Sequence, residues 1–418
     1  SFLVYGLGAT GKSVISFFKK NKITNFKVWD DYNKNFYKNK RPSNLNNALD
    51  KVNFIILSPG VSLLNNKNKK HLIKNKKKII TDLDLIFLIK NFLKSIVVTG
   101  TNGKSTTCKI LKHILKKNGF NALLGGNIGT PILNLKLKKN NFLIIEASSF
   151  QLAHSKFISP DYALLLNITN DHLDWHGSMK NYINSKLKIF ELQKKNQYSF
   201  LNKKFKRSFK KRNFLGKLII PNLKEYKKIK FKINNSYLKS NINNENMSFV
   251  LKLSHTLKIN NESFFKSLSS FAGLPHRHEV FFKRKNCTFI NDSKATSFQA
   301  TKSALENNKN IYWIMGGLPK KKDKFILKNL KKNIIRSYII GLNINFFKKQ
   351  LTNKVNYFIA HNLKNSIIQI LKDIKFYKKK NNVILLSPAS ASFDQFSNFE
   401  KRGEKFKRLV KHYARKYI

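Results

Sequence analysis

The sequence predicts an α/β fold in three domains, and three observations support this. Short apolar strands alternate with amphipathic helices along most of the chain, a pattern typical of parallel α/β units. Two glycine-rich loops each follow a predicted strand and open a predicted helix. The chain has 418 residues, which is too long for one ordinary core, and 41% of them are hydrophobic, so several cores can form.

The first series of elements predicts a Rossmann-like amino-terminal domain over residues 1–82. "FLVYG" reads as a strand, "TGKSVISFFKKN" as a helix and "NFKVWDD" as the next strand. "VNFIILSPGV" is a further strand that ends in a Pro-Gly turn.

The pattern restarts near Thr81 and predicts a central, P-loop ATPase-like domain with a mostly parallel sheet over residues 83–272. "KSIVVTG" is a strand that leads into the second glycine loop and its helix. "NFLIIEASS" and "DYALLLNIT" are again transitions from strand to loop. The stretch 191–245 is rich in Lys and Asn and predicts little.

A third α/β series follows "FAGLPHR" and predicts a Rossmann-like carboxyl-terminal domain over residues 273–418. Its strands are expected in "CTFINDSKAT", "NIYWIMGG", "RSYIIGL" and "NVILLSPASAS". Because parallel sheets bind ligands at the carboxyl ends of their strands, the polar residues that follow these strands are candidate site residues.

Composition limits the possible partners. The formal net charge is +61, which would attract a polyanion. The excess positive charge comes mostly from Lys, which is accompanied by abundant Asn and is spread along the chain. Compositional drift therefore explains the charge better than a polyanionic partner does. No nucleic-acid-binding motif accompanies it, and no apolar run approaches the roughly 20 residues that span a bilayer. We therefore expect no nucleic-acid partner and no membrane segment. Two cysteines without metal or disulfide spacing favour a cytoplasmic protein.

Each of the two glycine loops is a candidate for binding the phosphates of ATP. "LVYGLGATGKSV" fits the phosphate-loop pattern GxxxxGK[ST] through Gly6, Gly11, Lys12 and Ser13, and its glycines also fit the dinucleotide pattern GxGxxG. "VVTGTNGKSTT" keeps the Gly-Lys-Ser but has Val98 in place of the first glycine. The first loop can also be a tight turn that packs helix on strand, and the second a turn with a solvated lysine.

The chemistry around the second loop favours it as the ATP site. Its backbone N–H groups can bind phosphate oxygens, Lys104 can reach the β and γ phosphates, and Ser105 can offer a hydroxyl to Mg²⁺. Glu146 ends a nearby strand, a position suited to a metal carboxylate. "NITNDHLDWH" brings Asp171, His172 and Asp174 to the end of the next strand, and Lys186 follows on a helix. A structural histidine and an exposed lysine are the simpler alternatives for His172 and Lys186.

This combination of motifs resembles the Mur ligase family of ATP-dependent amide-forming enzymes. The residues that carry the resemblance are "TGTNGKST" (99–106), "GGNIGTP" (125–131), "EASSFQL" (146–152) and Asn167 through His172. Three later motifs are similar to those of the family members that add D-glutamate: "GLPHRHE" (273–279), "NDSKATS" (291–297) and "LSPASASFDQFSNFEKRGEKF" (386–406). The resemblance runs from the first domain to the last and thins only in the Lys/Asn-rich stretch.

The resemblance implies an activity. ATP would phosphorylate the alanyl carboxylate of UDP-N-acetylmuramoyl-L-alanine, and the amine of D-glutamate would then attack the acyl phosphate to form an amide. This is a step of cytoplasmic peptidoglycan precursor synthesis, carried out by an enzyme that we expect to be a monomer. The resemblance further implies ATP and Mg²⁺ at two sites, with a carbamylated Lys186 among the metal ligands.

The family's site residues transfer to this chain by position. The ATP-binding set is Gly100, Thr101, Asn102, Gly103, Lys104, Ser105, Thr106, Asn246, Arg277 and Asp292. The catalytic set is Lys104, His172 and Lys186, and the metal ligands are Ser105, Glu146, His172 and Lys186. The family commonly has a His-Asn pair before the adenine-contacting asparagine, and Ile242 stands at the His position here.

The remaining residues fall into two groups by the substrate they would contact. The UDP-substrate group is Ala9, Thr10, Asp30, Asp31, Ser58, Gly60 and Asn127. The D-glutamate group is Lys294, Thr296, Lys320, Ser392, Phe393 and Phe399, with Lys321 and Lys322 as competitors for Lys320. In this interpretation the first loop holds the UDP diphosphate, and Lys12 and Ser13 simply continue a helix.

Three alternatives remain. An NAD-dependent oxidoreductase would explain the first loop and Asp30 but leaves "TGTNGKST", Glu146 and Lys186 without a purpose. A nucleic-acid-binding NTPase would explain the charge, yet no helicase-type motif follows. Another Mur-type or folylpolyglutamate-type ligase with a different amino-acid specificity is the strongest competitor, and it predicts a different carboxyl-terminal pocket.

Overall fold

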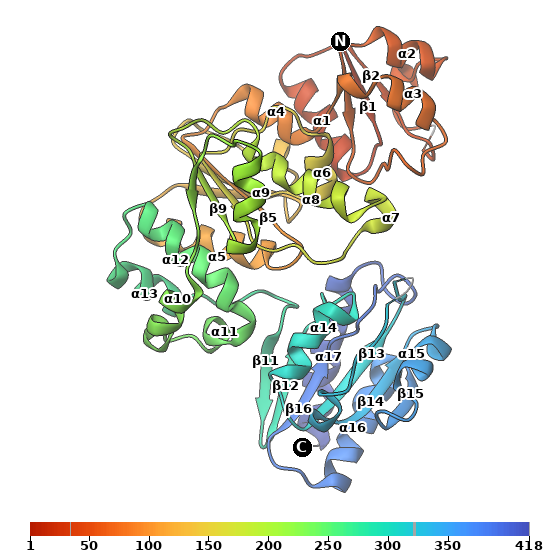
Figure 1. The fold of residues 1–418 in the computed structure, drawn as a ribbon. Coiled ribbons are helices and arrows are strands. Elements are labelled where there is room, and N and C mark those ends of the chain that lie inside the picture. Colours follow the sequence, from red (N-terminus) through yellow and green to blue (C-terminus); the bar gives the residue numbers. More distant parts are fainter. Residues whose placement is uncertain (34, 321–322, 418) are drawn as a thin grey trace. The chain divides into compact units, whose positions relative to one another are not determined.

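The computed structural model describes residues 1–33, 35–320 and 323–417. By their internal contacts these form two compact units: unit 1 consists of Ser1–Asn235 with Asn243–Phe271, and unit 2 of Ser236–Ile242 with the chain from Ala272 onward. The chain forms three separate α/β sheets, as the sequence predicts (Figure 1). No helix among the described residues is both long and apolar enough to cross a bilayer.

The first sheet is parallel and has the strand order β2-β1-β3-β4. Its strands are β1 (Phe2–Tyr5), β2 (Phe26–Trp29), β3 (Phe54–Leu57) and β4 (Ile79–Ile80). The helices between them are α1 (Ala9–Lys20), α2 (Leu45–Lys51) and α3 (Lys69–Lys74). Alternate residues of the strands face two different apolar clusters, which is the burial expected of a parallel sheet covered on both faces.

The second sheet is also parallel, in the order β10-β9-β8-β5-β7-β6. Its strands are β5 (Lys94–Thr99), β6 (Ala122–Gly126), β7 (Phe142–Glu146), β8 (Tyr162–Leu165), β9 (Tyr198–Leu201) and β10 (Lys217–Ile219). Helix α4 (Asp82–Ile89) precedes it. The later helices of unit 1 are α5 (Lys104–Lys117), α6 (Ser149–His154), α7 (Leu173–His176), α8 (Met179–Leu187), α9 (Lys206–Lys211), α10 (Leu223–Ile229), α12 (Asn244–Thr256) and α13 (Asn261–Ser269).

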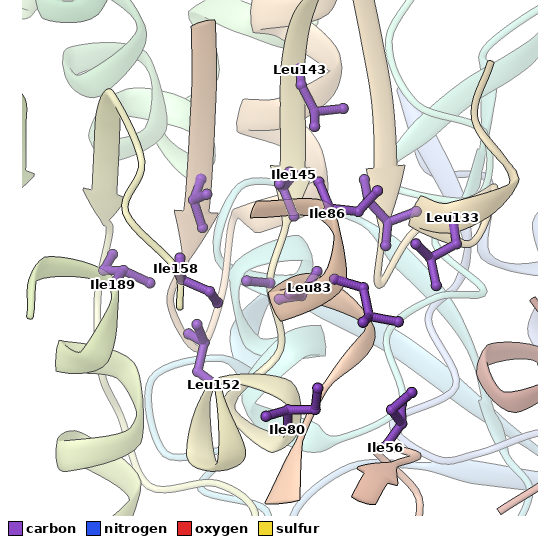
Figure 2. Close-up of a cluster of buried hydrophobic side chains, with 14 of the residues drawn as sticks. Ile56, Ile80, Leu83, Ile86, Leu133, Leu143, Ile145, Leu152, Ile158 and Ile189 are labelled. Atoms are coloured by element: carbon purple, nitrogen blue, oxygen red, sulfur yellow. The ribbon is translucent and has the colours of Figure 1, made fainter. Parts of the chain in front are cut away.

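One apolar cluster joins the first two sheets within unit 1. Figure 2 shows Ile56 and Ile80 from the first sheet, Leu83 and Ile86 from α4, and Ile145 from the second sheet in this cluster. Helix α4 starts with a capping box in which the Thr81 N–H donates to the Asp84 carboxylate (2.8 Å). The connection between the sheets is therefore a packed helix rather than a loose linker.

Unit 2 holds the third sheet, in the order β11-β12-β16-β13-β14-β15, which is parallel except for β11. Its strands are β11 (Glu279–Arg284), β12 (Cys287–Asn291), β13 (Ile311–Gly316), β14 (Ile334–Ile340), β15 (Tyr357–His361) and β16 (Asn382–Leu386). Its helices are α11 (Ser236–Lys239), α14 (Phe298–Glu306), α15 (Ile344–Leu351), α16 (Leu363–Tyr377) and α17 (Phe399–Tyr417). Each sheet falls inside one of the ranges 1–82, 83–272 and 273–418, which stay our proposal for the domain boundaries.

Candidate active site

The second glycine loop connects β5 to α5 and has a backbone that only glycine accommodates. Gly100 and Gly103 have φ angles of +156° and +86°. A Cβ atom on Gly103 would overlap the side-chain amide of Asn246, which lies in the first turn of α12. Asn246 is therefore packed against the loop, and its role in nucleotide binding stays a prediction.

Two lysines converge on one carbonyl of this loop. Lys104 Nζ donates to the carbonyl oxygens of Gly100 and Thr101 at 2.9 Å each, and Lys186 Nζ donates to the Gly100 oxygen at 2.8 Å. Lys186 is only 1% exposed. Burial, and after it the positive charge of Lys104, lower the pKa of Lys186 well below its usual value. Lys186 is thus no solvated surface lysine, and a neutral amine is favoured there.

Tyr182 links Lys186 to the loop, and sequence reasoning missed it. Its hydroxyl lies 2.9 Å from Thr101 Oγ1, and Lys186 Nζ lies 4.8 Å from the centre of its ring. Tyr182 precedes Lys186 by four residues on α8, so the two side chains share one face of the helix. The four-residue spacing between Tyr182 and Lys186 was the feature of the sequence from which the role of Tyr182 could have been inferred.

Glu146 and Asn127 meet at the carboxyl ends of β7 and β6. Asn127 Nδ2 donates to Glu146 Oε1 (3.0 Å). Glu146 is 2% exposed, and its Oε2 has no hydrogen-bond partner within the described parts of the chain. A buried carboxylate oxygen without a partner is costly unless a cation neutralises it. Ser105 is buried as well, in the first turn of α5.

His172 lies in a left-handed turn before α7, with φ +54°. Its N–H donates to Asp171 Oδ1 (3.0 Å), and its ring meets the ring of Phe150 edge-on at 4.7 Å. His172 also lies 6.4 Å from the Tyr182 ring, on which Lys186 packs. Across the described residues, no group of three or more His, Cys, Asp or Glu side chains is arranged to hold a metal ion. A metal site here would need the Ser105 hydroxyl, a modified Lys186 or substrate oxygens.

The first glycine loop has a different construction. Helix α1 begins at Ala9, so Ala9 and Thr10 form its amino terminus and Lys12 and Ser13 lie inside it. Ser13 Oγ donates to the Thr10 carbonyl (2.7 Å), and Lys12 Nζ lies 4.9 Å from the Phe36 ring. The prediction that Lys12 and Ser13 continue a helix is confirmed.

Close packing holds this loop against β3. Ser58 Oγ donates to the Gly6 carbonyl (2.6 Å), and a Cβ atom on Gly11 would overlap that same carbonyl. Gly60 is exposed, and a Cβ atom on it would have no atom within 4 Å among the described residues other than its chain neighbours. The amino terminus of α1 can still bind an anion such as a diphosphate, because its first N–H groups lack helical partners.

The two predicted uridine-side acids make hydrogen bonds within the protein. Asp30 accepts the backbone N–H groups of Leu7 (2.7 Å), Tyr32 (2.9 Å) and Asn33 (2.8 Å). Partial burial alone would raise the pKa of Asp30, but these bonds keep it below its usual value. Asp31 accepts from the Tyr5 hydroxyl, the Trp29 indole and the amides of Asn66 and Asn68. Both acids therefore shape the loops beside the first glycine loop.

In unit 2 the "GLPHRHE" and "NDSKATS" motifs fold onto each other. The His278 N–H donates to Asp292 Oδ1 (3.1 Å), and the Lys294 N–H donates to the His276 carbonyl (3.1 Å). Burial raises the pKa of Asp292 to about 6, with the Ser387 hydroxyl, the His278 N–H and Arg277 acting in the opposite direction. Arg277 is thus close enough to Asp292 to influence it.

Of the predicted D-glutamate residues, Lys294 and Phe399 are in contact at the start of α17. Lys294 Nζ lies 5.0 Å from the centre of the Phe399 ring. Phe393 is 70% exposed, so it is not a core residue, while Ser392 is buried. Thr296 is half-buried and Lys320 is exposed. Lys321 and Lys322 lie outside the described residues.

Arg402 connects the "NDSKATS" motif to the motif that begins "LSPASAS", and sequence reasoning did not single it out as a site residue. Its guanidinium donates to Ser293 Oγ (3.0 Å), the Ser293 carbonyl (2.8 Å) and the Ser390 carbonyl (3.0 Å), and the residue is 1% exposed. A Cβ atom on the adjacent Gly403 would overlap the His276 ring. The small residue after the arginine was the signal that this stretch of a charged helix is buried.

Comparison with known proteins matches the whole chain. Residues 98–273 match the model of the Mur ligase middle domain. A UDP-N-acetylmuramoylalanine--D-glutamate ligase of Rickettsia felis is 34% identical over 454 residues, with 98% of this chain and 97% of the relative covered. The relative of the same name in Buchnera aphidicola subsp. Schizaphis graminum is 35% identical, with 98% and 97% covered.

Two solved structures share the fold at low sequence identity. The MurF ligase of Thermotoga maritima, crystallised with ADP, has a TM-score of 0.60 and 18% identity, with 99% of this chain and 95% of that chain covered. The UDP-N-acetylmuramate-alanine ligase MurC of the same organism has a TM-score of 0.57 and 16% identity, with 99% of both chains covered.

Proposed function

The chain belongs to the Mur ligase family, among the UDP-N-acetylmuramoylalanine--D-glutamate ligases, and from this premise we propose which of its residues bind the substrates and support the reaction. Its activity is the ATP-dependent addition of D-glutamate to UDP-N-acetylmuramoyl-L-alanine in peptidoglycan synthesis. The related ligases of different amino-acid specificity, the strongest competitor at the level of sequence, are disfavoured because relatives of 34% identity over nearly the full length carry the D-glutamate name.

We propose that the reaction passes through an acyl phosphate. The γ-phosphoryl group of ATP is transferred to the alanyl carboxylate, and ADP leaves. The neutral amine of D-glutamate then attacks the acyl carbon, so that the new C–N bond forms, phosphate leaves and the amine releases one proton. Such transfers depend on alignment and on neutralising charge rather than on a protein nucleophile. The loop 100–106 supplies both requirements through its backbone N–H groups and Lys104, whose bonds to Gly100 and Thr101 would be exchanged for phosphate oxygens.

The residues beside the loop fit Mg²⁺. Glu146 has a buried oxygen without a hydrogen-bond partner among the described residues, and Ser105 lies at the start of α5. Both offer the hard oxygen ligands that Mg²⁺ takes. When bound, Mg²⁺ would neutralise the charge on the phosphate oxygens. Asn127 fixes one oxygen of Glu146 and would leave the other directed to the metal. His172 is our proposal for the second of two Mg²⁺ sites.

The buried environment of Lys186 is the observation that supports this proposal most directly. A buried lysine with a strongly lowered pKa presents a neutral amine, and only the neutral amine can attack CO₂. The new N–C bond gives a carbamate and releases one proton. The carbamate has two oxygens where the ammonium had none, so Lys186 would become a metal ligand beside Lys104.

Separate sets of residues would bind the UDP substrate, D-glutamate and the nucleotide. Ala9 and Thr10 would bind the diphosphate of UDP at the amino terminus of α1, with Ser58, Gly60, Asp30 and Asp31 shaping that pocket. Asn127 would approach the muramoyl-alanine end. Lys294, Thr296, Lys320, Ser392, Phe393 and Phe399 would bind D-glutamate, and Arg277 and Asp292 are assigned to the nucleotide. A monomer acting in the cytoplasm, where ATP is available, completes the proposal.

The experiment that tests this proposal is detection of the carbamate. Protein equilibrated with ¹³C-labelled bicarbonate should show a carbamate carbon signal in its NMR spectrum, and the signal should be absent in Lys186→Ala. Because the carbamate forms only from neutral amine, the signal should persist near neutral pH and fade on acidification. A spectrum of the wild-type protein without this signal would contradict the assignment of Lys186.

A further inference from the structure

The side chain of Asn167 makes hydrogen bonds to both the N–H and the carbonyl of Asn102 in the proposed ATP loop. Asn167, which follows β8, accepts the Asn102 N–H at its Oδ1 (2.8 Å) and donates from its Nδ2 to the Asn102 carbonyl (3.2 Å). The Thr101 N–H also donates to the Asn167 carbonyl (2.8 Å). Asn102 is exposed. The conformation in which the loop offers its N–H groups therefore depends on how the Asn167 amide is oriented.

Glu245 reinforces the orientation of the Asn167 amide that the Asn102 backbone requires. Its Oε2 accepts from Asn167 Nδ2 (3.2 Å), and its Oε1 accepts from Asn202 Nδ2 (2.8 Å), so it bridges the ends of β8 and β9. An ionised carboxylate only accepts hydrogen bonds, whereas an amide has a donor end and an acceptor end. The NH₂ group of Asn167 must therefore face Glu245, and its oxygen is left to face the Asn102 N–H. A rotated Asn167 amide would lose these two contacts and its bond to the Asn102 carbonyl.

We propose that Glu245 is a positioning residue for ATP binding, acting on the loop through Asn167. Glu245 lies in the first turn of α12, immediately before Asn246, which packs against Gly103. The start of this helix thus reaches the loop twice, directly through Asn246 and indirectly through Glu245. The inference rests on the proposed ATP loop and adds a residue that no motif of the loop contains.

A purely structural role is the competing explanation. An acidic residue in the first turn of a helix stabilises that helix through its dipole, wherever the helix lies. The chain offers a matched control in Glu225, which occupies the first turn of α10, a helix that packs on α12. Glu225 is partly exposed, and among the described residues its ion-pair partner is His255, at 3.9 Å. Loss of the helix-dipole effect alone should make Glu225→Gln and Glu245→Gln equivalent.

The test is the affinity of the full chain for MgADP, measured by calorimetry without the other substrates. Glu245→Gln should weaken binding about tenfold, since the loss corresponds to one misaligned hydrogen-bonded contact, while Glu225→Gln should bind like the wild type. In steady-state assays the Glu245→Gln variant should raise KM for ATP and leave KM for D-glutamate unchanged. Because nucleotide binding is measured directly, a chain without ligase activity would contradict the proposed function and still test Glu245.

A double-mutant cycle decides whether Glu245 acts through Asn167. In the Asn167→Ala background, Glu245→Gln should cause no further loss of MgADP affinity. Additive losses, equal losses in the Glu225 control or wild-type affinity in Glu245→Gln would each overturn the proposal. If Glu245→Gln does not fold, Asn202→Ala, which removes the second amide of Glu245, should weaken MgADP binding about threefold, and unchanged affinity there would overturn the proposal too.

Discussion

Replacing Lys186 with alanine should reduce the turnover of the ligase reaction about a thousandfold, the scale of losing a group that stabilises charge in the transition state. The physical reason is the loss of the proposed carbamate, a carboxylate-like ligand, from a buried side chain whose Nζ lies against the Gly100 carbonyl and close to Lys104. Added short carboxylates such as acetate should restore part of the activity, because they can enter the space left by the side chain and carry the missing oxygens.

The measurement is phosphate release from ATP in the presence of both other substrates, with and without acetate. Lys180→Ala is the matched control, since Lys180 lies on the same helix α8 but is exposed. It should retain wild-type turnover and not respond to acetate. Unchanged turnover of Lys186→Ala would remove Lys186 from the metal site.

Replacing Glu146 with glutamine should lower turnover about a hundredfold and raise the Mg²⁺ concentration needed for half-maximal rate. Glutamine has nearly the same shape and keeps an oxygen for the Asn127 amide. It removes the negative charge from the buried oxygen that has no hydrogen-bond partner in the part of the chain that the structure describes. Because a neutral amide costs less to bury than a carboxylate, the free energy of unfolding measured without Mg²⁺ should not fall.

Mg²⁺ titrations of the rate and denaturant unfolding curves in chelator check the two parts of this expectation. Glu191→Gln, at an exposed position, should change neither quantity. A large loss of stability in Glu146→Gln together with an unchanged Mg²⁺ requirement would show that Glu146 is a structural residue rather than a metal ligand.

The three sheets could be predicted from the sequence because each strand is a short apolar run that ends in a turn or a polar loop. The assignment of ATP to the second loop stays a prediction and rests on local features: Glu146 ends a strand, His172 follows the next strand and Lys186 lies on a helix soon after. The structure adds that Lys12 and Ser13 lie inside α1, where the Ser13 hydroxyl donates to the Thr10 carbonyl and Lys12 Nζ lies over the Phe36 ring.

The remaining features depend on contacts between segments far apart in the chain, which no local pattern reports. Arg402 looks like one of many surface cations, yet it is buried because Ser293 and Ser390 offer it three acceptors. Asp30 looks like a ligand-binding acid, but three backbone N–H groups already bind it. Glu245 is linked to the proposed ATP loop through Asn167, which lies 78 positions earlier in the sequence.

The central claim, a ligase that adds D-glutamate, is tested most directly by the initial rate of phosphate release from ATP with UDP-N-acetylmuramoyl-L-alanine and a panel of D- and L-amino acids. The rate should rise above background with D-glutamate and stay near background with L-glutamate and the other amino acids. A high rate with a different amino acid and none with D-glutamate would contradict the claim.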